Sequence, residues 1–116
     1  MPGHAVVHFE IGCHDSSETA SFFGDLFGWD VSDAGMAKMI DTGGAQGIAG
    51  HFAELASEWG TYVTVYVEVA DLERYLEKAI ELGGKTLVKP VELPGQGSFA
   101  WLGSPEGHII GLWKAE

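Results

Sequence analysis

The order of apolar and polar residues repeats once along the chain. Residues 63–87, moved back by 56 positions, align without a gap with residues 7–31. Identical residues then coincide at four pairs of positions: Val63 and Val7, Asp71 and Asp15, Leu82 and Leu26, and Gly84 and Gly28. Two copies of one supersecondary unit therefore make up the fold.

Each copy opens with an alternating strand. Val7, Phe9 and Ile11 alternate with His8 and Glu10, which predicts a half-buried strand whose apolar face is turned toward the helix. The second copy repeats this alternation. Its apolar residues are Val63, Val65, Val67 and Val69, and the polar residues between them are Thr64, Tyr66 and Glu68. The polar residues of each strand should share one face of its sheet.

An amphipathic helix follows each strand. In the first copy Asp15 is placed to cap the helix, Glu18 can reach back to the cap, and Gly28 ends the helix. The apolar residues at helical spacing are Phe22, Phe23, Leu26 and Phe27 in this copy, and Leu72, Tyr75, Leu76, Ala79 and Ile80 in the second. The second helix stops at Gly83 and Gly84.

A second strand follows the glycine that ends each helix, and the remainder of each copy is predicted to be strand and turn. The candidate strands are residues 36–41, 47–53, 98–102 and 108–113, and Ala53 to Gly60 joins the copies. A loop before the last hairpin is indicated by Pro90, Pro94, Gly95 and Gly97. The pattern predicts an α+β fold of two tandem β-α-β-β-β modules.

Composition narrows the class of protein. The 116 residues are 46% hydrophobic, enough for one domain with a core, so residues 1–116 are expected to form a single domain. Six Lys and Arg residues against 17 Asp and Glu residues give a formal charge of -11. Such a chain repels phosphate backbones, so a nucleic acid partner is not expected.

The chain shows no sign of export or of a membrane partner. Cys13 is the single cysteine and cannot form an internal disulfide. The start of the sequence has no basic region followed by a long apolar run, and no stretch reaches the roughly 20 apolar residues that a membrane span requires. A cytoplasmic location is predicted.

Five segments resemble the vicinal oxygen chelate superfamily, which includes glyoxalase I, bleomycin resistance proteins and extradiol dioxygenases. The segments are residues 6–10, 22–29 and 67–71, the pair Gly83 and Gly84, and residues 104–113. The resemblance implies curved mixed sheets that form a cleft, with the helices outside. It places the first module at about 4–53 and the second at about 61–114, and it implies a homodimer.

Metal-using members of that superfamily take one ligand from the first and one from the last strand of each module. The corresponding positions here are His8, Gly50 or His51, Thr64 and Gly111, of which only His8 clearly matches. Since glycine has no side chain and threonine is a poor ligand, the resemblance implies that the metal site is largely lost and that no cofactor is bound. The alternative is a divalent metal (Ni, Zn, Mn or Fe) held by His8, His51, Glu10 and Glu68.

The residues also suggest a pocket for a small organic molecule. Phe99, Trp101 and Trp113 are expected to line the cleft in space left open by Gly111. The predicted ligand-binding residues are His8, Glu10, Thr64, Tyr66, Glu68, Phe99, Trp101 and Trp113.

Three functions stay open at this point. The leading hypothesis is a binder of a small, planar or hydrophobic molecule, as in bleomycin resistance proteins. A second is an enzyme, either a metal-dependent glyoxalase-like lyase, isomerase or dioxygenase, or a metal-free acid-base catalyst. In the metal-free case the candidates are Glu10 and Glu68, because two carboxylates facing one cleft would raise the pKa of at least one. A structural or interaction module with a closed cleft is the third.

Overall fold

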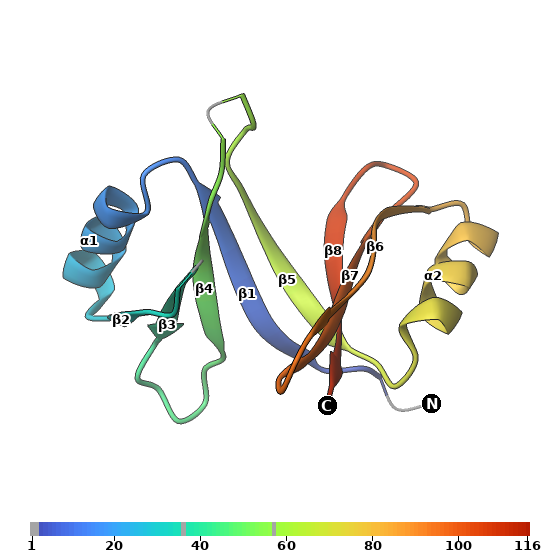
Figure 1. The fold of residues 1–116 in the computed structure, drawn as a ribbon, viewed down its shortest axis with the longest axis horizontal. Coiled ribbons are helices and arrows are strands. Elements are labelled where there is room, and N and C mark those ends of the chain that lie inside the picture. The colour runs from blue at the N-terminus through green and yellow to red at the C-terminus, as the bar shows by residue number, and fades with distance from the viewer. Residues whose placement is uncertain (1–2, 36, 57) are drawn as a thin grey trace. The chain divides into compact units, whose positions relative to one another are not determined.

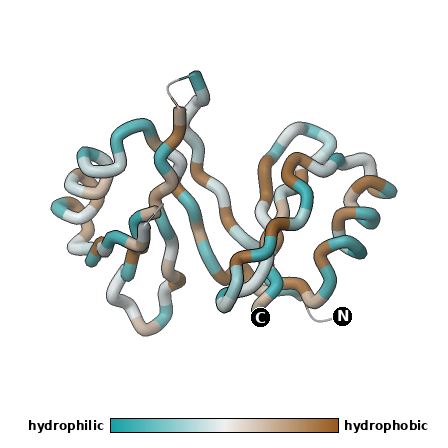
Figure 2. The backbone as a smooth tube through the Cα atoms, in the orientation of Figure 1, coloured by the Kyte–Doolittle hydropathy of each residue, from teal (hydrophilic) through white to brown (hydrophobic). Residues whose placement is uncertain are grey.

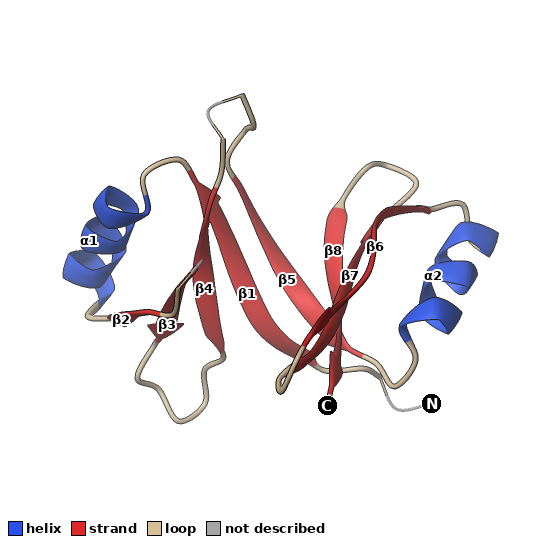
Figure 3. Cartoon of the chain, in the orientation of Figure 1, coloured by secondary structure: helices blue, strands red, loops and turns tan. Residues whose placement is uncertain are grey.

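The computed structural model of the protein describes residues 3–35, 37–56 and 58–116. The elements are, in order, β1 (Val6–Cys13), α1 (Ser16–Phe27), β2 (Asp30–Asp33), β3 (Ala37–Asp41), β4 (Ala49–Glu54), β5 (Tyr62–Glu68), α2 (Leu72–Glu81), β6 (Lys85–Leu93), β7 (Gly97–Gly103) and β8 (Ile109–Ala115). Figure 3 shows this order, in which strand, helix and three strands occur twice, so the predicted α+β fold of two β-α-β-β-β modules is confirmed. No helix in the described ranges is long and apolar enough to cross a membrane.

The chain divides into two compact units. We call His8–Thr64 the N-terminal unit, and Met1–Val7 with Val65–Glu116 the C-terminal unit. The boundaries fall inside β1 and β5, so the first two residues of β1 belong to the C-terminal unit and the first three of β5 to the N-terminal unit.

The N-terminal unit is a mixed sheet with one helix beside it (Figure 1). Its strands lie in the order β2-β3-β4-β1, and β1 pairs with β4 in parallel while the other neighbours are antiparallel. The core consists of buried Cys13, Ile40 and Phe52, against which pack Phe9, Ile11, Ala20, Phe23, Trp29 and Val31. The apolar face of β1 therefore meets α1 as the alternation predicted.

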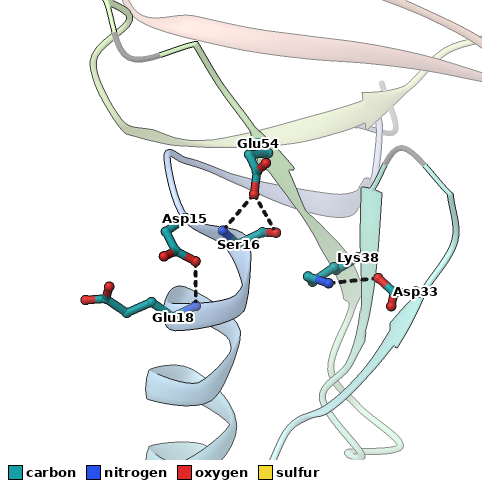
Figure 4. A network of polar contacts seen from close by, with 6 residues as sticks. All are labelled: Asp15, Ser16, Glu18, Asp33, Lys38 and Glu54. Atoms are coloured by element: carbon teal, nitrogen blue, oxygen red, sulfur yellow. Dashed lines mark hydrogen bonds and ion pairs between the residues drawn. The ribbon is translucent and has the colours of Figure 1, made fainter.

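Polar contacts fix the start of α1 against β4 (Figure 4). The Asp15 carboxylate accepts from the backbone N–H of Glu18 at 2.9 Å, which confirms the predicted cap. The Glu18 side chain points away from Asp15, so the predicted return bond is wrong. Glu54, at the end of β4, accepts from the backbone N–H of Ser16 at 3.0 Å and from its hydroxyl at 2.8 Å. These two bonds lower the pKa of Glu54.

The apolar stripe of α1 is wider than the core it meets. Phe23 packs into the core, whereas Phe22, Leu26 and Phe27 are exposed. The spacing correctly predicted the helix, but a stripe of adjacent apolar residues does not say how much of it a four-stranded sheet can cover.

The C-terminal unit has the strand order β5-β8-β7-β6, with β5 and β8 parallel and the other pairs antiparallel. Apolar and polar residues alternate along β5, and α2 carries both kinds along its length (Figure 2). The core contains Val69, Leu72, Leu76, Ala100 and Leu112. Asp71 caps α2 by accepting from the backbone N–H of Arg74 at 3.1 Å.

The loop before the last hairpin is shorter than predicted. Pro90 lies inside β6, and Gly97 begins β7, so the predicted loop is confined to residues 94–96. Proline fits because β6 is an edge strand, whose pairing with β7 shifts register between Val88 and Val91. Residue 36, which opened one predicted strand, lies outside the described residues, and β3 begins at Ala37.

Replacement of the core phenylalanine is expected to destabilise the protein strongly. Phe52 is fully buried, so Phe52→Ala removes a ring from packed surroundings and should lower the unfolding free energy by about 3–5 kcal/mol. Phe22→Ala, the same change at an exposed ring, should shift it by no more than about 0.5 kcal/mol. Urea unfolding followed by circular dichroism measures both, and equal losses would contradict the assigned core.

Candidate functional site

The polar face of β1 carries the candidate site. His8 and Glu10 are two residues apart on β1, and strand pairing places His51 of β4 directly opposite Glu10. Glu10 is 4% exposed, while His8 and His51 are partly exposed. A carboxylate this deeply buried needs hydrogen-bond donors, and its neighbours supply them.

Four side chains of the N-terminal unit form one hydrogen-bonded chain, which we call the relay: His8, His51, Glu10 and Tyr62. Nε2 of His8 lies 2.7 Å from Nδ1 of His51, and Nε2 of His51 lies 3.1 Å from Oε1 of Glu10. The hydroxyl of Tyr62, at the start of β5, donates to the other carboxylate oxygen of Glu10. The relay thus runs from a partly exposed imidazole to a buried carboxylate.

The relay has a defined direction when Glu10 is ionised. Its carboxylate can only accept, so His51 donates from Nε2 and its Nδ1 carries a lone pair. That lone pair accepts from the Nε2–H of His8, which leaves Nδ1 of His8 as the basic nitrogen of that ring. One carboxylate therefore sets the tautomers of two histidines.

The pKa of His8 is strongly shifted. Burial of the imidazole, reinforced by neighbouring His51 and opposed by Glu10, lowers the pKa of His8 from 6.5 to about 4. The ring is therefore neutral at physiological pH and can accept a proton or donate its Nε2–H to His51.

Tyr62 was missed by the sequence analysis. Its ring lies over Gly12, where a Cβ would overlap the ring carbons. Gly12 has the parity of His8 and Glu10 along β1, and Tyr62 has the parity of Thr64 and Tyr66 along β5. The signal was present in the alternation, but the strand was predicted to begin at Val63, one residue too late.

The two predicted carboxylates lie in different surroundings. Glu10 is buried in the N-terminal unit, whereas Glu68 is an exposed residue of the C-terminal unit whose backbone N–H donates to the carbonyl of Ala5 at 2.9 Å. Thr64 is buried at 4% exposure on β5, within the N-terminal unit. That Glu10 and Glu68 face the same cleft remains a prediction.

The predicted aromatic residues lie in the C-terminal unit, where Phe99 and Trp101 both contact Tyr66. Trp101 donates from Nε1 to the hydroxyl of Tyr66 at 2.9 Å, and the ring of Phe99 meets Tyr66 edge-on at a centroid distance of 6.4 Å. Tyr66 also lies directly over Gly111, so the space expected there is filled by a ring. Trp113 packs over Gly97 on β7, where a Cβ would lie 2.7 Å from Cζ2 of the indole.

The relay does not provide a ready metal site. His51 turns one nitrogen to His8 and the other to Glu10, so its ring separates the two other donors. In the part of the chain that the structure describes, no three His, Cys, Asp or Glu side chains are grouped to hold one ion. A metal would have to compete with the hydrogen bonds of the relay for the same lone pairs.

Comparison with known proteins identifies a family. A family model described as a glyoxalase-like domain matches residues 6–112. A search among curated proteins gave no match.

Solved structures of low sequence identity share the fold. A Streptomyces coelicolor methylmalonyl-CoA epimerase in complex with 2-nitronate-propionyl-CoA is 16% identical, with 98% of this chain and 99% of that chain covered and a TM-score of 0.66. A glyoxalase/bleomycin resistance protein/dioxygenase superfamily member from Vibrio splendidus is 17% identical (96% and 98% covered, TM-score 0.67). The Mn(II)-bound glyoxalase from Novosphingobium aromaticivorans is 16% identical (97% and 39% covered, TM-score 0.66).

The protein should become less stable as the pH is lowered, because of His8. The unfolded chain binds a proton at this residue near pH 6.5, whereas the folded protein does so only near pH 4. The unfolding free energy should therefore decrease as pH falls through this window, by about 1–2 kcal/mol for a ring that keeps part of its exposure. Urea unfolding of the wild type and of His8→Gln, which cannot titrate, measures the difference in slope. Parallel slopes would contradict the lowered pKa.

Gly12 is expected to be essential for the position of Tyr62. In Gly12→Ala the new methyl group would displace the tyrosine ring and with it the hydroxyl that binds Glu10, lowering the unfolding free energy by about 1–3 kcal/mol. Gly60→Ala is the control, since a Cβ at Gly60 meets no atom within 4 Å. Chemical denaturation of both variants checks this, and equal stability of the two would refute the close contact.

Proposed function

Because the chain belongs to the glyoxalase-like domain family, we propose that it is an acid-base enzyme that moves a proton at a carbon beside a carbonyl group. The substrate is a small organic molecule. The observation that carries the proposal is the relay of His8, His51, Glu10 and Tyr62. Such a chain of donors and acceptors can take up a proton at one end and stabilise the resulting charge at the other.

The proton is exchanged through His8. Its Nδ1 takes the proton from the substrate carbon, and the electron pair of the broken C–H bond stays on the substrate as an enolate. The Nε2–H of His8 then passes to Nδ1 of His51, across the 2.7 Å contact. The reverse steps return a proton to carbon, so no other reactant is consumed.

Glu10 makes this transfer favourable. The Glu10 carboxylate lies 3.1 Å from Nε2 of the ring that receives the proton and attracts positive charge there, whereas burial lowers the pKa of His8. Tyr62 holds the second carboxylate oxygen and thereby fixes the direction of the first. Glu10 and Tyr62 act as positioning residues in this scheme.

Charge narrows the substrate class. The N-terminal unit has nine Asp and Glu residues and a single Lys or Arg residue, Lys38, which pairs with Asp33 at 2.8 Å. A phosphate-rich substrate would meet repulsion there. We therefore propose a carbonyl substrate without phosphate groups. The Streptomyces coelicolor neighbour, which is an epimerase bound to a CoA ester, supports the reaction type but not this substrate charge.

Binding without chemistry is the second candidate. It is favoured by the aromatic residues of the C-terminal unit, where Trp101 and Tyr66 hold one another and Phe99, Trp101 and Trp113 stay partly exposed. Rings fixed in this way lose little entropy when a planar molecule stacks on them. If the protein only binds, a ligand should quench its tryptophan fluorescence, and the protein should not catalyse proton exchange on that ligand.

Solvent deuterium exchange tests the enzyme. Small aldehydes, ketones and acyl thioesters, with and without phosphate groups, are incubated in D2O, and carbon-bound deuterium is followed by proton NMR. We expect exchange with a phosphate-free carbonyl compound, reduced about 100-fold or more in His8→Ala and in Glu10→Gln. The control His108→Ala changes an exposed histidine of the C-terminal unit and should keep the wild-type rate.

A metal titration completes this test. Exchange should persist with a chelator, and calorimetry with Ni, Zn, Mn and Fe(II) should show no tight one-to-one complex, because the ligand nitrogens are engaged in the relay. Tight binding that His8→Ala abolishes would overturn the metal-free scheme. Exchange that survives His8→Ala, or no exchange with any compound, would overturn the proposed enzyme.

A further inference from the structure

Helix α1 presents an apolar face that the N-terminal unit does not cover. The exposed fractions are 60% for Phe22, 59% for Leu26 and 56% for Phe27. Phe22 and Leu26 are four residues apart and therefore neighbours on the helix surface. Large apolar side chains grouped at this exposure are typical of interaction sites. We call these three residues the α1 patch.

The patch is continuous with the core. The ring of Phe23 lies between exposed and buried rings, with centroids 5.0 Å from Phe22 and 6.2 Å from both Phe27 and Phe52. Trp29 lies 5.2 Å from Phe27 and 5.7 Å from Phe23. Because the exposed rings rest on packed ones, the patch offers a pre-ordered surface, which lowers the entropy cost of binding.

Acidic residues border the patch. Glu18 precedes Phe22 by four residues and Asp25 follows it by three, so both carboxylates are neighbours of Phe22 on the helix surface. Asp25 also lines an open hollow of about 460 Å3 beside α1, together with Trp29 and with Asp33 and Lys38, which pair with each other. The sequence from residue 1 to residue 37 contains no Lys or Arg. The border of the patch is therefore negative.

We propose that the α1 patch docks a basic amphipathic helix of a partner protein. Apolar side chains of that helix would pack on Phe22, Leu26 and Phe27, and its Lys or Arg side chains would lie against Glu18 and Asp25. This partner brings opposite charge to an N-terminal unit with nine acidic residues and one basic residue.

The charge pattern disfavours a second copy of the chain at this patch. Two copies joined through α1 would bring Glu18 and Asp25 of one against the same residues of the other, without a basic residue on either helix. Like charges across an interface cost free energy and slow association. The homodimer implied by the sequence resemblance would need a different surface.

A labelled peptide tests the docking surface. The probe is a designed amphipathic helix of leucine and lysine, about 18 residues long, and its counterpart replaces each lysine by glutamate. Fluorescence anisotropy of the full chain should show binding of the lysine peptide that weakens as salt rises. The double variant Phe22→Ser with Leu26→Ser should weaken binding about tenfold or more.

Matched variants separate apolar from electrostatic contributions. Glu18→Gln with Asp25→Asn should weaken binding severalfold and reduce its salt dependence. Ile80→Ser, a similar change at an exposed residue of α2, should leave binding unchanged. The circular dichroism spectrum of each variant confirms that it is folded.

Three results would overturn the proposal. If the glutamate peptide binds as tightly as the lysine peptide, charge does not select the partner. If the double serine variant binds the lysine peptide as tightly as the wild type, the peptide does not bind at the α1 patch. A dimer in analytical ultracentrifugation that the double variant dissociates would make a second copy the occupant. The deuterium exchange assay does not involve α1, so the enzyme proposal and the docking proposal can fail separately.

Discussion

The buried carboxyl group of Glu10 is the group on which the polar face of the N-terminal unit depends. At 4% exposure it has lost nearly all contact with water, and an ionised group in that position needs donors on both oxygens. His51 and Tyr62 supply them from two other strands, and the bond to His51 in turn sets the acceptor nitrogen that faces His8. Removal of His51 would break two of these contacts at once, because its ring binds both His8 and Glu10, whereas removal of Tyr62 would break only its own bond to the carboxylate.

The duplicated modules put different chemistry at equivalent positions. On β1 and β4, Glu10 lies opposite His51, whereas the corresponding pair on β5 and β8 is Tyr66 opposite Gly111. The glycine allows the tyrosine ring to lie on the strand, so the second module is filled at the place where the first carries titratable groups. Gly12 plays the same steric part for Tyr62, but there the ring serves to bind a carboxylate. The two modules thus share one backbone pattern, and the hydrogen-bonded histidines and carboxylate lie in the first of them.

The sequence predicted the order of the modules, and it named three of the four relay residues as candidates, His8, Glu10 and His51. A gapless repeat and two alternating strands predicted the module order, and the parity of His8 and Glu10 placed them on one face, because side-chain direction in a strand depends only on position. Contacts between distant segments were beyond this reasoning. Tyr62 and Glu10 are 52 residues apart, and nothing local in the sequence shows that a ring will cross Gly12. The space predicted at Gly111 was wrong for the same reason, since a glycine can mark an open pocket or a ring packed on the backbone.

The width of the apolar stripe on α1 shows where local periodicity stops being informative. Phe22, Phe23, Leu26 and Phe27 are equally apolar, yet only Phe23 belongs to the core, because a single helix can turn a limited arc toward a four-stranded sheet. Exposed rings cost solubility unless charge or a partner compensates. Glu18 and Asp25 supply that charge beside the patch, as the excess of carboxylates does for the whole N-terminal unit. The same acidity also disfavours phosphate-rich ligands and self-association through α1, so one feature of composition underlies both the proposed substrate and the proposed partner.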